Sequence, residues 1–174
     1  MFHDEDGNFL ENNEERMIFY CKGVIETVKK LGWAPEFIHC QGWFSSLVPM
    51  YIKKIYNEDP LFKDTKVIYN VFDTEFEGSL NSEIINKLLF ENKLEKSDLN
   101  MLKNPTFENL SKFAISYSDA VIQGSKSINS KVLQFMKDSN LPIMNFPGEE
   151  DYESQYNDFF ESLVEKEELE LTEE

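Results

Sequence analysis

The sequence predicts an α/β fold in three layers: a small parallel sheet of about four strands with helices on both faces. Short apolar runs alternate along the chain with segments whose apolar residues recur at helical spacing. Strands that alternate with helices form right-handed crossovers, which produce a parallel sheet covered by helices. Neither an internal repeat nor a change in composition marks a second domain. We therefore expect one domain over residues 1–164, followed by an irregular acidic tail over 165–174.

The predicted strands are runs that are short and apolar enough to be buried on both faces. They are EFIHC at 36–40, KVIYNVF at 66–72, AVIQ at 120–123 and LPIMNF at 141–146. The second run is rich in β-branched and aromatic residues, which fit the pleated surface of a sheet.

The first helix is predicted from about residue 13 to Gly32. Asn12 or Asn13 is placed to cap its beginning, and two glutamates in the first turn, Glu14 and Glu15, match the positive end of the helix dipole. Gly32 ends the helix as its C-cap. The apolar residues that recur at steps of three and four, and so are expected on one buried face, are Met17, Cys21, Val24, Val28 and Leu31.

Further helices follow between the strands. One is predicted from about 45 to 56, with Pro49 in its first turn, where a missing N–H is tolerated. Residues 80–117 are predicted as two or three helical pieces, and a last helix is expected near 151–164. The residues expected to face the core from these segments and from the helix after the third strand are Leu47, Met50, Tyr51, Ile55, Leu110, Phe113, Ala114, Ile128, Val132, Phe135 and Met136.

Charge and composition exclude several classes of function. The 174 residues carry a net charge of −16 with no basic patch in the sequence, so nucleic acid and anionic membrane surfaces would be repelled. No apolar run approaches the roughly 20 residues of a membrane-spanning helix, and the acidic N-terminus does not resemble a signal peptide. Two cysteines, Cys21 and Cys40, are too few for a disulfide framework. We expect a soluble protein of the reducing cytoplasm.

The first candidate site is the corner at the end of the first strand. Ligands of parallel α/β sheets bind at the carboxyl ends of the strands, where loops converge beside helix N-termini. His39 lies inside the strand and is interpreted mainly as a core histidine, with a ligand contact as the alternative. Gln41 and Gly42 suit either an amide exposed to a crevice or simple turn formation. Trp43 is interpreted mainly as packing, and alternatively as a wall on which a sugar stacks.

Two later loops bring polar residues to the same edge. Asp73, Glu75 and Glu77 carry the oxygens that a hard metal ion prefers, but alternate acids in an acidic protein are more typical of a solvated edge. Gly124 and Ser125 open a strand-to-helix turn that can bind an anion, although one glycine is a weak signal. We therefore predict no metal and no other cofactor. No nucleophile with its base is evident, so no catalytic residue is assigned.

A longer pattern is more specific than any of these motifs. Its members are Asn13 to Arg16, Leu31-Gly32-Trp33, Pro35, His39, Trp43, Leu47, Pro49 and Tyr51. This order resembles the N-terminal catalytic region of bacterial starch and glycogen synthases, where a "DN-ER" turn precedes an LGW-P-hydrophobic-His-x-His-Asp-Trp segment and a leucine-proline helix. A later segment, ISYSDAVIQGSKSIN, is similar to that family's following strand and turn. The resemblance covers roughly residues 13–78 and 106–135.

The resemblance implies a Rossmann-like fold, here part of the N-terminal half of a glycosyltransferase with two such domains. It also implies transfer of glucose from ADP-glucose to an α-1,4-glucan with retention, so ADP-glucose and glucan are the implied partners. The chain departs from the family at four positions. Gln41 and Gly42 stand where the family has its second histidine and an aspartate, and Phe72 and Asp73 where it has a histidine-asparagine pair. The candidate substrate-binding residues are His39, Gln41, Trp43, Asp73 and Ser125.

The aligned region contains neither the family's lysine-containing glycine loop nor its basic C-terminal domain. Those cations offset the charge of the departing ADP, so we expect this chain to be an incomplete or divergent member that is inactive alone. A non-catalytic module that binds glucan or a partner is the alternative, and an unrelated small α/β enzyme is a third reading. Without the family's first strands, a sheet edge is expected to be open, to be covered by a homodimer or by a complementing chain.

Overall fold

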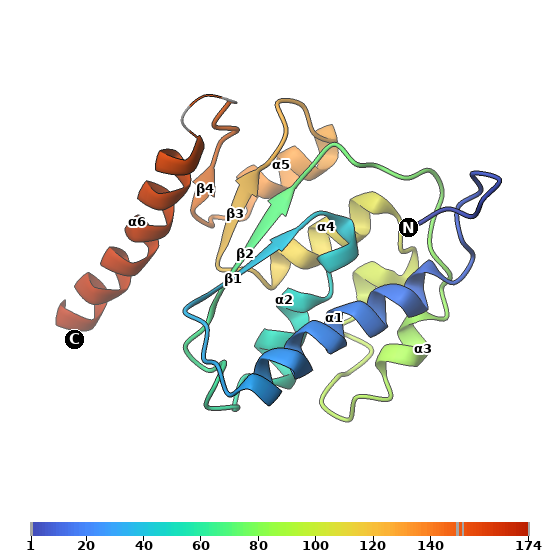
Figure 1. Cartoon of the computed structure of the whole chain (residues 1–174), viewed down its shortest axis with the longest axis horizontal. Helices are drawn as coiled ribbons and strands as arrows, with labels where there is room; N and C mark the ends of the chain where they lie inside the picture. Colours follow the sequence, from blue (N-terminus) through green and yellow to red (C-terminus); the bar gives the residue numbers. More distant parts are fainter. Residues whose placement is uncertain (1, 149, 151, 174) are drawn as a thin grey trace.

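The computed structural model describes residues 2–148, 150 and 152–173, with side chains described through residue 164. At its centre is a parallel sheet in which, within these residues, four strands lie in chain order (Figure 1). The strands are β1 (Phe37–Gln41), β2 (Lys66–Val71), β3 (Ala120–Gln123) and β4 (Ile143–Met144). The predicted α/β class with a parallel sheet is confirmed.

The register of the strands brings their carboxyl ends to one edge of the sheet. Gln41, the last residue of β1, pairs with Asn70 of β2, and Val71 pairs with Gln123 of β3. Because successive side chains of a strand point to opposite faces, Gln41 and Asn70 share a face with His39. The loops that follow β1, β2 and β3 therefore begin close together.

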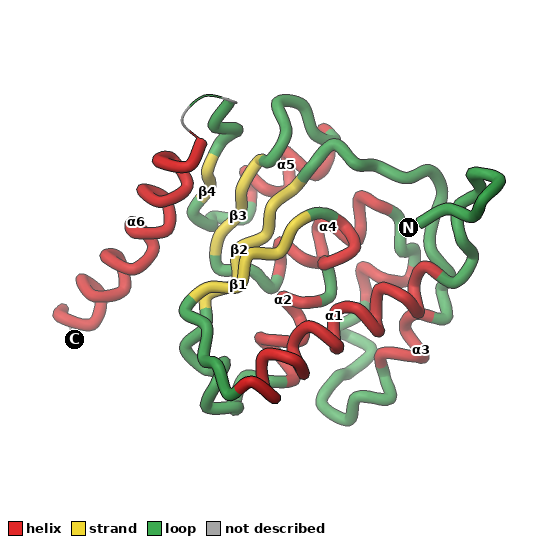
Figure 2. The backbone as a smooth tube through the Cα atoms, in the orientation of Figure 1, coloured by secondary structure: helices red, strands yellow, loops and turns green. Residues whose placement is uncertain are grey.

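Most helices cover one face of the sheet, and Figure 2 shows α6 (Tyr152–Glu173) by itself on the other. The helices of the first face are α1 (Asn13–Leu31), α2 (Val48–Met50), α4 (Phe107–Ser116) and α5 (Ser130–Asp138), with α3 (Ile84–Leu88) against α1. Between them and the sheet lies the main core, whose largest fully buried side chains include Met17, Ile25, Tyr51, Phe62, Tyr69 and Phe113.

Helix α1 has the predicted bounds but a different buried face. Gly32 ends it in the left-handed conformation, with φ of 64°, as predicted. The buried residues of α1 are Asn13, Glu14, Met17, Cys21 and Ile25. Val24 and Leu31, predicted to face the core, are 40% and 72% exposed, so that part of the prediction is wrong. The 3-10 turn at Trp43–Ser45, α2 and α3 contact α1. The buried stripe repeats every fourth residue from Met17 and leaves Val24 and Leu31 to its side.

The beginning of α1 is not held by the predicted side-chain cap. Asn12 occupies the N-cap position without a side-chain hydrogen bond to the helix. The amide of Asn13 instead donates from Nδ2 to the carbonyl oxygen of Phe2, at 3.0 Å. Asn13 therefore ties the N-terminal segment to the helix.

The segment predicted as one helix from 45 to 56 is divided into three short pieces. They are a 3-10 turn at Trp43–Ser45, α2 at Val48–Met50 and a π-helical turn, η2, at Tyr51–Ile55. Pro49 lies in the first turn of α2, as expected, and the N–H of Tyr56 bonds to the carbonyl of Tyr51 at 3.0 Å, which closes the wider turn. Leu47, Met50 and Tyr51 are fully buried, so the predicted inward face is correct although the helix is irregular.

The helical region 80–117 and the helix after β3 agree with the sequence. Besides α3 and α4, the first contains a 3-10 turn, η3, at Asn100–Lys103. Thr106 caps α4 by accepting a hydrogen bond from the N–H of Asn109 at 3.2 Å. Asn129 caps α5 in the same way, through Lys131 and Val132. Of the residues predicted to face the core, Leu110, Phe113, Ala114, Ile128, Val132 and Met136 are buried, and Phe135 is half-buried.

The end of the chain differs from the prediction in two boundaries. β4 spans two residues, Ile143–Met144, rather than 141–146, because β3 offers it pairing only at Val121 and Ile122. Helix α6 continues to Glu173 rather than ending near 164. Glutamate and leucine are good helix formers, and the segment after Tyr152 contains no glycine or proline. Among the helices of the described residues, none combines the length and apolar content needed to cross a membrane.

Helix α6 supplies the third layer of the fold. Leu163 is buried against Ile68, Ala120, Ile122 and Met144 of the sheet. The rings of Phe37 and Phe160 stack with their centroids 5.4 Å apart and 20° between their planes. The predicted three-layer arrangement is therefore present, with one helix on the second face.

Candidate functional site

The corner after β1 is fixed by Gly42. This residue has φ of 69°, a left-handed conformation that favours glycine, and its N–H bonds to the carbonyl of Asn70 at 3.0 Å. The hydroxyl of Ser45 then donates to the carbonyl of Gly42 at 2.9 Å and holds the following turn. As a result the side chain of Gln41 stays exposed at the carboxyl end of the sheet.

The loops after β2 and β3 are tied together by the predicted residues Asp73 and Ser125. The Ser125 hydroxyl donates to Oδ1 of Asp73 at 2.9 Å, and the N–H of Asp73 donates back to Oγ of Ser125 at 3.2 Å. Nε2 of Gln123 also donates to the carbonyl of Ser125 at 2.9 Å. Both predicted residues therefore belong to one polar group beside the strand ends, although much of their hydrogen-bonding capacity is used between them.

Gly124 allows β2 and β3 to approach at this edge. A Cβ atom at this position would lie 2.1 Å from Oδ1 of Asn70 and 2.8 Å from Cε1 of Phe72. The Gly124 N–H bonds to the carbonyl of Val71 at 2.8 Å. The glycine is thus required for a close approach within the sheet, a reason that the sequence pattern did not give.

His39 faces α6 rather than the open edge. Its ring lies 5.7 Å from that of Tyr156 and 5.8 Å from that of Phe160. Burial lowers the pKa of His39, and its Nε2 has no hydrogen-bond partner within the described residues. The half-buried position of His39 fits the interpretation as a core histidine. Its unpartnered Nε2 shows that the two ring nitrogens are not both hydrogen-bonded within the described residues.

Trp43 is 4% exposed and lies in a cluster of aromatic rings. Its ring centroid is 4.8 Å from those of Phe2 and Phe76 and 6.0 Å from that of Phe9. This packing position agrees with the main interpretation of Trp43. A cavity of about 470 Å³ lies beside the cluster and is lined by these rings together with Gln41 and Thr74. We call it the aromatic cavity.

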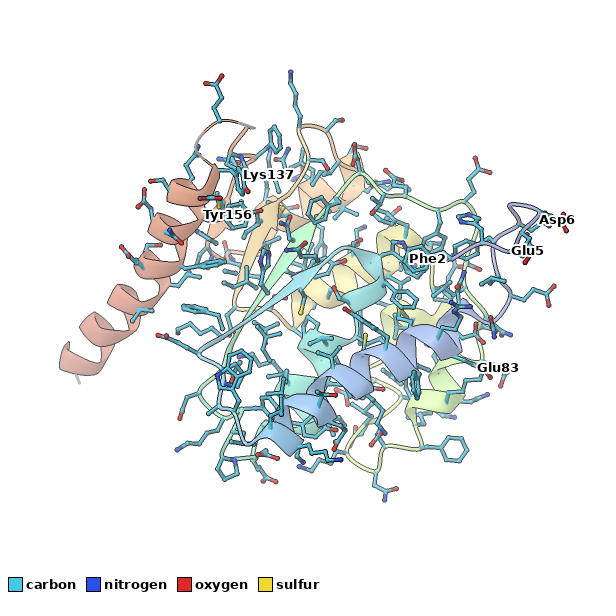
Figure 3. All side chains as sticks on the ribbon, in the orientation of Figure 1. Phe2, Glu5, Asp6, Glu83, Lys137 and Tyr156 are labelled. Atoms are coloured by element: carbon cyan, nitrogen blue, oxygen red, sulfur yellow. The ribbon has the colours of Figure 1, made fainter. Side chains whose placement is uncertain are left out.

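A second cavity, of about 500 Å³, lies on the other side of Gln41, between the strand ends and α6. We call it the α6 cavity. Its lining residues are His39, Gln41, Asn70, Phe72, Tyr152, Glu153, Tyr156 and Asn157. Figure 3 labels Tyr156 where α6 meets the sheet, and its hydroxyl accepts a hydrogen bond from Nδ2 of Asn70 at 2.8 Å. Gln41 and Phe72 line both cavities, so the two lie next to each other at the strand ends and together make up the candidate site.

The carboxylates of the 71–78 loop have separate partners. Asp73 bonds to Ser125, and Oε2 of Glu75 accepts from Nδ2 of Asn129 at 2.9 Å. Within the described residues, no group of three histidine, cysteine or acidic side chains is placed to hold a metal ion. These two contacts join the loop after β2 to the loop after β3 and to the N-cap residue of α5.

The two cysteines lie in the core and are not joined. Cys21 donates from Sγ to the carbonyl of Phe44 at 3.3 Å, and burial raises its pKa to about 12. Burial also raises the pKa of Cys40, which is 3% exposed. Both thiols are therefore protonated at neutral pH and poorly reactive.

The structure thus brings Gln41, Asp73 and Ser125 to one edge and places His39 and Trp43 beneath it on opposite faces. Several residues of the site were not predicted from the sequence: Asn70, Tyr152, Glu153, Tyr156 and Asn157. Asn70 carried a signal, since an amide inside the apolar run KVIYNVF has to find partners when buried. The four residues of α6 carried none, because nothing local indicates which face of the sheet a terminal helix covers.

A parallel sheet in chain order, with polar loops gathered at its carboxyl edge, defines the class of this protein as an α/β domain of the Rossmann-like kind. Residues 1–142 match the family model described as starch synthase catalytic domain, and the chain belongs to that family. The resemblance found in the sequence is confirmed. Helix α6 lies beyond the matched residues.

Curated relatives agree with this membership. A glycogen synthase from Chlorobium luteolum (strain DSM 273) is 39% identical over 85 residues, which are 49% of this chain and 17% of the relative. A glycogen synthase from Clostridium perfringens is 27% identical over 137 residues, 75% of this chain and 27% of the relative. The chain therefore spans a quarter or less of the length of most such relatives.

A solved structure shows the same fold. The catalytic domain of starch synthase IV from Arabidopsis thaliana, bound to ADP and acarbose, superimposes with a TM-score of 0.61 at 13% identity. The match covers 80% of this chain and 30% of that one. It supports the Rossmann-like half-domain over a larger part of the chain than the 49% aligned with the Chlorobium luteolum relative.

Proposed function

We propose that the edge formed by Gln41, Asp73 and Ser125 is one wall of a glycogen synthase-type sugar site, and that this chain does not transfer glucose by itself. One observation carries the proposal. Among the described residues that line the two cavities there is no lysine and no arginine, whereas Glu75 and Glu153 contribute carboxylates. A site of this charge holds a neutral sugar but gives no counter-charge to a diphosphate.

The missing cations matter because of the leaving group. Departure of ADP from ADP-glucose places additional negative charge on the diphosphate, and fixed positive groups usually provide the largest part of such stabilisation. Gln41 adds an uncharged amide where the family has a histidine, and Phe72 adds no polar group. ADP-glucose and α-glucan are thus proposed as the ligands of the completed site, with its opposing wall supplied from elsewhere.

ADP release tests this proposal directly. The purified chain is mixed with ADP-glucose and glycogen, with the glycogen synthase of Chlorobium luteolum as the active control. We expect no ADP above the rate without protein. Steady ADP release in proportion to the concentration of this chain would overturn the proposal.

A glucan-binding module without catalysis is the second candidate, and the aromatic cavity favours it. Phe2, Phe9, Trp43 and Phe76 offer ring faces of the kind on which sugars stack, beside the exposed amide of Gln41. Sedimentation with glycogen separates the candidates, since a binding module is retained in the pellet without any turnover. Phe76→Ser should then reduce retention, whereas Phe90→Ser, at a ring that is 85% exposed outside the cavity, should leave it unchanged.

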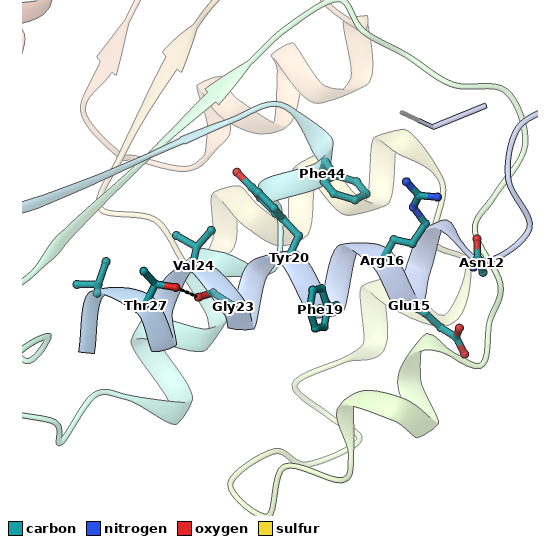
Figure 4. A pocket seen from close by; sticks show the side chains of 10 residues that line it. Asn12, Glu15, Arg16, Phe19, Tyr20, Gly23, Val24, Thr27 and Phe44 are labelled. Atoms are coloured by element: carbon teal, nitrogen blue, oxygen red, sulfur yellow. Dashed lines mark hydrogen bonds between the residues drawn. The ribbon is translucent and has the colours of Figure 1, made fainter. Parts of the chain in front are cut away.

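A partner strand is proposed at the open edge of the sheet. Of the described strands, β1 has a neighbour on one side only, which is β2. A groove of about 840 Å³ runs along α1 close to that edge, and Figure 4 shows Phe19, Tyr20 and Val24 along it with Phe44 above. A smaller cavity lined by Tyr20, Val24 and Ile38 joins the groove to β1. Unpaired strand edges beside apolar surface recruit further strands.

The proposed occupant of this edge is a second copy or a complementing chain with the rest of the domain. Light scattering across protein concentration distinguishes the two, since a second copy gives a dimer with the chain alone. Phe19→Ser, at a ring that is 80% exposed, should then weaken the dimer. The buried free thiols of Cys21 and Cys40 support placing the protein in the reducing cytoplasm.

A further inference from the structure

The outer edge of β1 has no neighbouring strand within the described residues. In a parallel ladder each residue directs its N–H and C=O to one side, and the next residue directs them to the other. The carbonyl of Glu36 accepts from the N–H of Lys66, at the start of β2, at 2.9 Å. The N–H of Gly42 donates to the carbonyl of Asn70, also in β2, at 3.0 Å. The residues whose N–H and C=O groups therefore point away from β2 are Phe37, His39 and Gln41.

A cavity of about 260 Å³ follows this edge of β1. Successive side chains of a strand point to opposite faces, so consecutive residues share a cavity where it runs along their backbone. Figure 4 shows Tyr20 and Val24 of α1, which line the cavity from the helix side. The residues that line it from β1 are four consecutive ones, Ile38, His39, Cys40 and Gln41. The free space therefore borders the hydrogen-bonding edge and not only one face of the strand.

The surface beside this edge is apolar. Tyr20 and Val24 are 42% and 40% exposed, and both also line the groove of about 840 Å³ along α1. An added strand would place every second side chain over α1, where these two residues and Phe19 are open to contact. Unpaired backbone groups beside an apolar groove match the way in which an extended peptide adds a strand to a sheet.

The handedness of the fold predicts the direction of the added strand. The strands β1 to β4 lie in chain order, and the helices between them cover the first face of the sheet. Right-handed crossovers over one face advance across a parallel sheet in one direction. Helix α1 lies on that same face and leads into β1. A strand that continues this pattern on the open side of β1 is therefore parallel to β1.

A second copy of the chain does not fit this requirement. When two copies pair the same strand across a closed two-fold axis, a ladder forms only with the two strands antiparallel. Such a pair would also bring together two chains that each carry a net charge of −16. A separate segment that carries lysine or arginine is instead attracted to a chain of this charge.

We propose that the outer edge of β1 takes up a parallel strand of a separate, positively charged polypeptide, whose alternate apolar side chains pack over Tyr20 and Val24 of α1. This inference rests on the proposed partner strand and selects between its two occupants. Backbone hydrogen bonds to Phe37, His39 and Gln41 supply the register, and the charge of the chain supplies the preference for a basic partner.

Hydrogen exchange tests the ladder. A blocked peptide of alternating valine and lysine, matched in length to β1, is added to the uniformly ¹⁵N-labelled full chain. In the free chain we expect fast exchange at the amides of Phe37, His39 and Gln41, and saturating peptide should slow each at least about ten-fold. A spin label on the carboxyl end of the peptide should broaden the amide of Gln41 more than that of Phe37. Unchanged exchange at the three amides, or stronger broadening at Phe37, overturns the proposal.

Methylation of the peptide nitrogens separates strand pairing from general adhesion. One peptide is methylated at its valines and another at its lysines, so that only one of them loses the N–H groups that face β1. We expect the affinity of that peptide to fall at least about ten-fold and the affinity of the other to stay near that of the unmethylated peptide. Equal affinities of the two methylated peptides contradict a backbone ladder.

The apolar contact is tested on the chain itself. Tyr20→Ser should weaken the valine-lysine peptide about five-fold, because a ring beside the edge is lost. Phe90→Ser removes a ring that is 85% exposed and outside both the groove and the edge cavity, and it should bind as the parent does. Equal affinities in the two variants contradict packing of the added strand over α1.

The charge preference is tested with a peptide of alternating valine and glutamate. At low ionic strength we expect it to bind about ten-fold more weakly than the lysine peptide, and added salt should reduce the difference. Equal binding of the two peptides at low salt contradicts a basic partner. Light scattering of the chain alone should show a monomer, and a dimer with slow exchange at Phe37, His39 and Gln41 would overturn the choice of a separate polypeptide.

These outcomes are separable from that of the proposed sugar site. ADP release by the chain alone overturns that site's dependence on an opposing wall and leaves the strand standing if the lysine peptide still slows exchange in β1. Failure of the lysine peptide to bind, with no ADP release, overturns the added strand alone.

Discussion

The hydroxyl of Tyr156 accepts a hydrogen bond from Nδ2 of Asn70 at 2.8 Å, and this contact joins a helix outside the family match to a strand inside it. Asn70 is a buried amide in β2, and Tyr156 lies on the face of α6 that covers the sheet. The contact therefore has two consequences. It partly satisfies a buried amide, and it fixes where the first turns of α6 lie over the strand ends.

The first prediction concerns how much the hydrogen bond between Tyr156 and Asn70 contributes to the stability of the fold. Tyr156→Phe keeps the ring packing but leaves the buried Asn70 amide without its partner, so the free energy of unfolding should fall by about 1–2 kcal/mol. Tyr152→Phe, one turn earlier on the same helix and 51% exposed, should change it by less than about 0.5 kcal/mol. Urea unfolding followed by circular dichroism measures both. Equal losses in the two variants would show that the hydrogen bond does not anchor α6.

Gly124 carries the second prediction. Gly124→Ala would place Cβ 2.1 Å from Oδ1 of Asn70, so the strand end must shift, and we expect a loss of about 1–3 kcal/mol. Gly23→Ala is the matched control, because Gly23 lies within α1 with no atom near the added Cβ, and it should stabilise the fold by about 0.5–1 kcal/mol.

The cause of the Gly124 effect can be isolated. Repeating Gly124→Ala in an Asn70→Ala background removes one of the two close contacts, so the additional loss should be smaller than in the parent. Thermal unfolding of the four proteins forms the cycle. Strictly additive losses would argue against a clash with Asn70.

His39 gives a prediction about pH. Burial lowers its pKa from the ordinary value of 6.5, so the unfolded chain binds a proton that the folded chain resists. The stability from neutral His39 is therefore present above pH 6.5 and declines as the pH falls below that value towards the lowered pKa. His39→Gln should flatten the stability profile between about pH 6.5 and 5.

An exposed ring that does not titrate provides the control for that profile. Phe90 is 85% exposed, and Phe90→Gln should leave the slope of the parent unchanged. The measurement is urea unfolding at a series of pH values, with the slope of free energy against pH as the result. A profile that is as steep in His39→Gln as in the parent contradicts the assignment.

The ion pair of Lys87 and Glu14 gives the last prediction. Glu14 is 2% exposed, and its Oε1 accepts from Nζ of Lys87 at 2.8 Å, which joins α3 to α1. Lys87→Met leaves a buried carboxylate without its counter-charge and should lower stability by about 2–3 kcal/mol. Lys93→Met, whose partner Glu58 is 82% exposed, should lower it by less than about 0.5 kcal/mol. Similar effects of the two changes in chemical unfolding would count against a structural role for the buried pair.

Local patterns were enough to predict most elements of the fold. Gly32 ends α1 because its left-handed conformation is a property of one residue, and apolar spacing identified the strands at 66–72 and 120–123. Where more than one face of a helix could be buried, the local sequence did not decide between them. Val24 and Leu31 have the spacing of a buried face, but packing chose the adjacent stripe with Ile25.

The candidate site was predictable only in part for a related reason. Gln41, Asp73 and Ser125 follow strands, and parallel strands bring such positions to one edge whatever else the chain does. Asn70 and Tyr156 meet because α6 crosses back over the sheet, a contact between residues 86 positions apart. No spacing rule within a strand or a helix includes such a pair.

The sequence by itself determined the order of strands and helices, the parallel sheet and membership of the starch synthase family, because these follow from periodicity and from residues in a fixed order. Only the tertiary structure decided which face α6 covers, which polar atoms it leaves unpaired and how the two cavities share Gln41. Those features depend on how side chains distant in sequence fill the same space, and such packing is settled by the whole fold rather than by any segment of it.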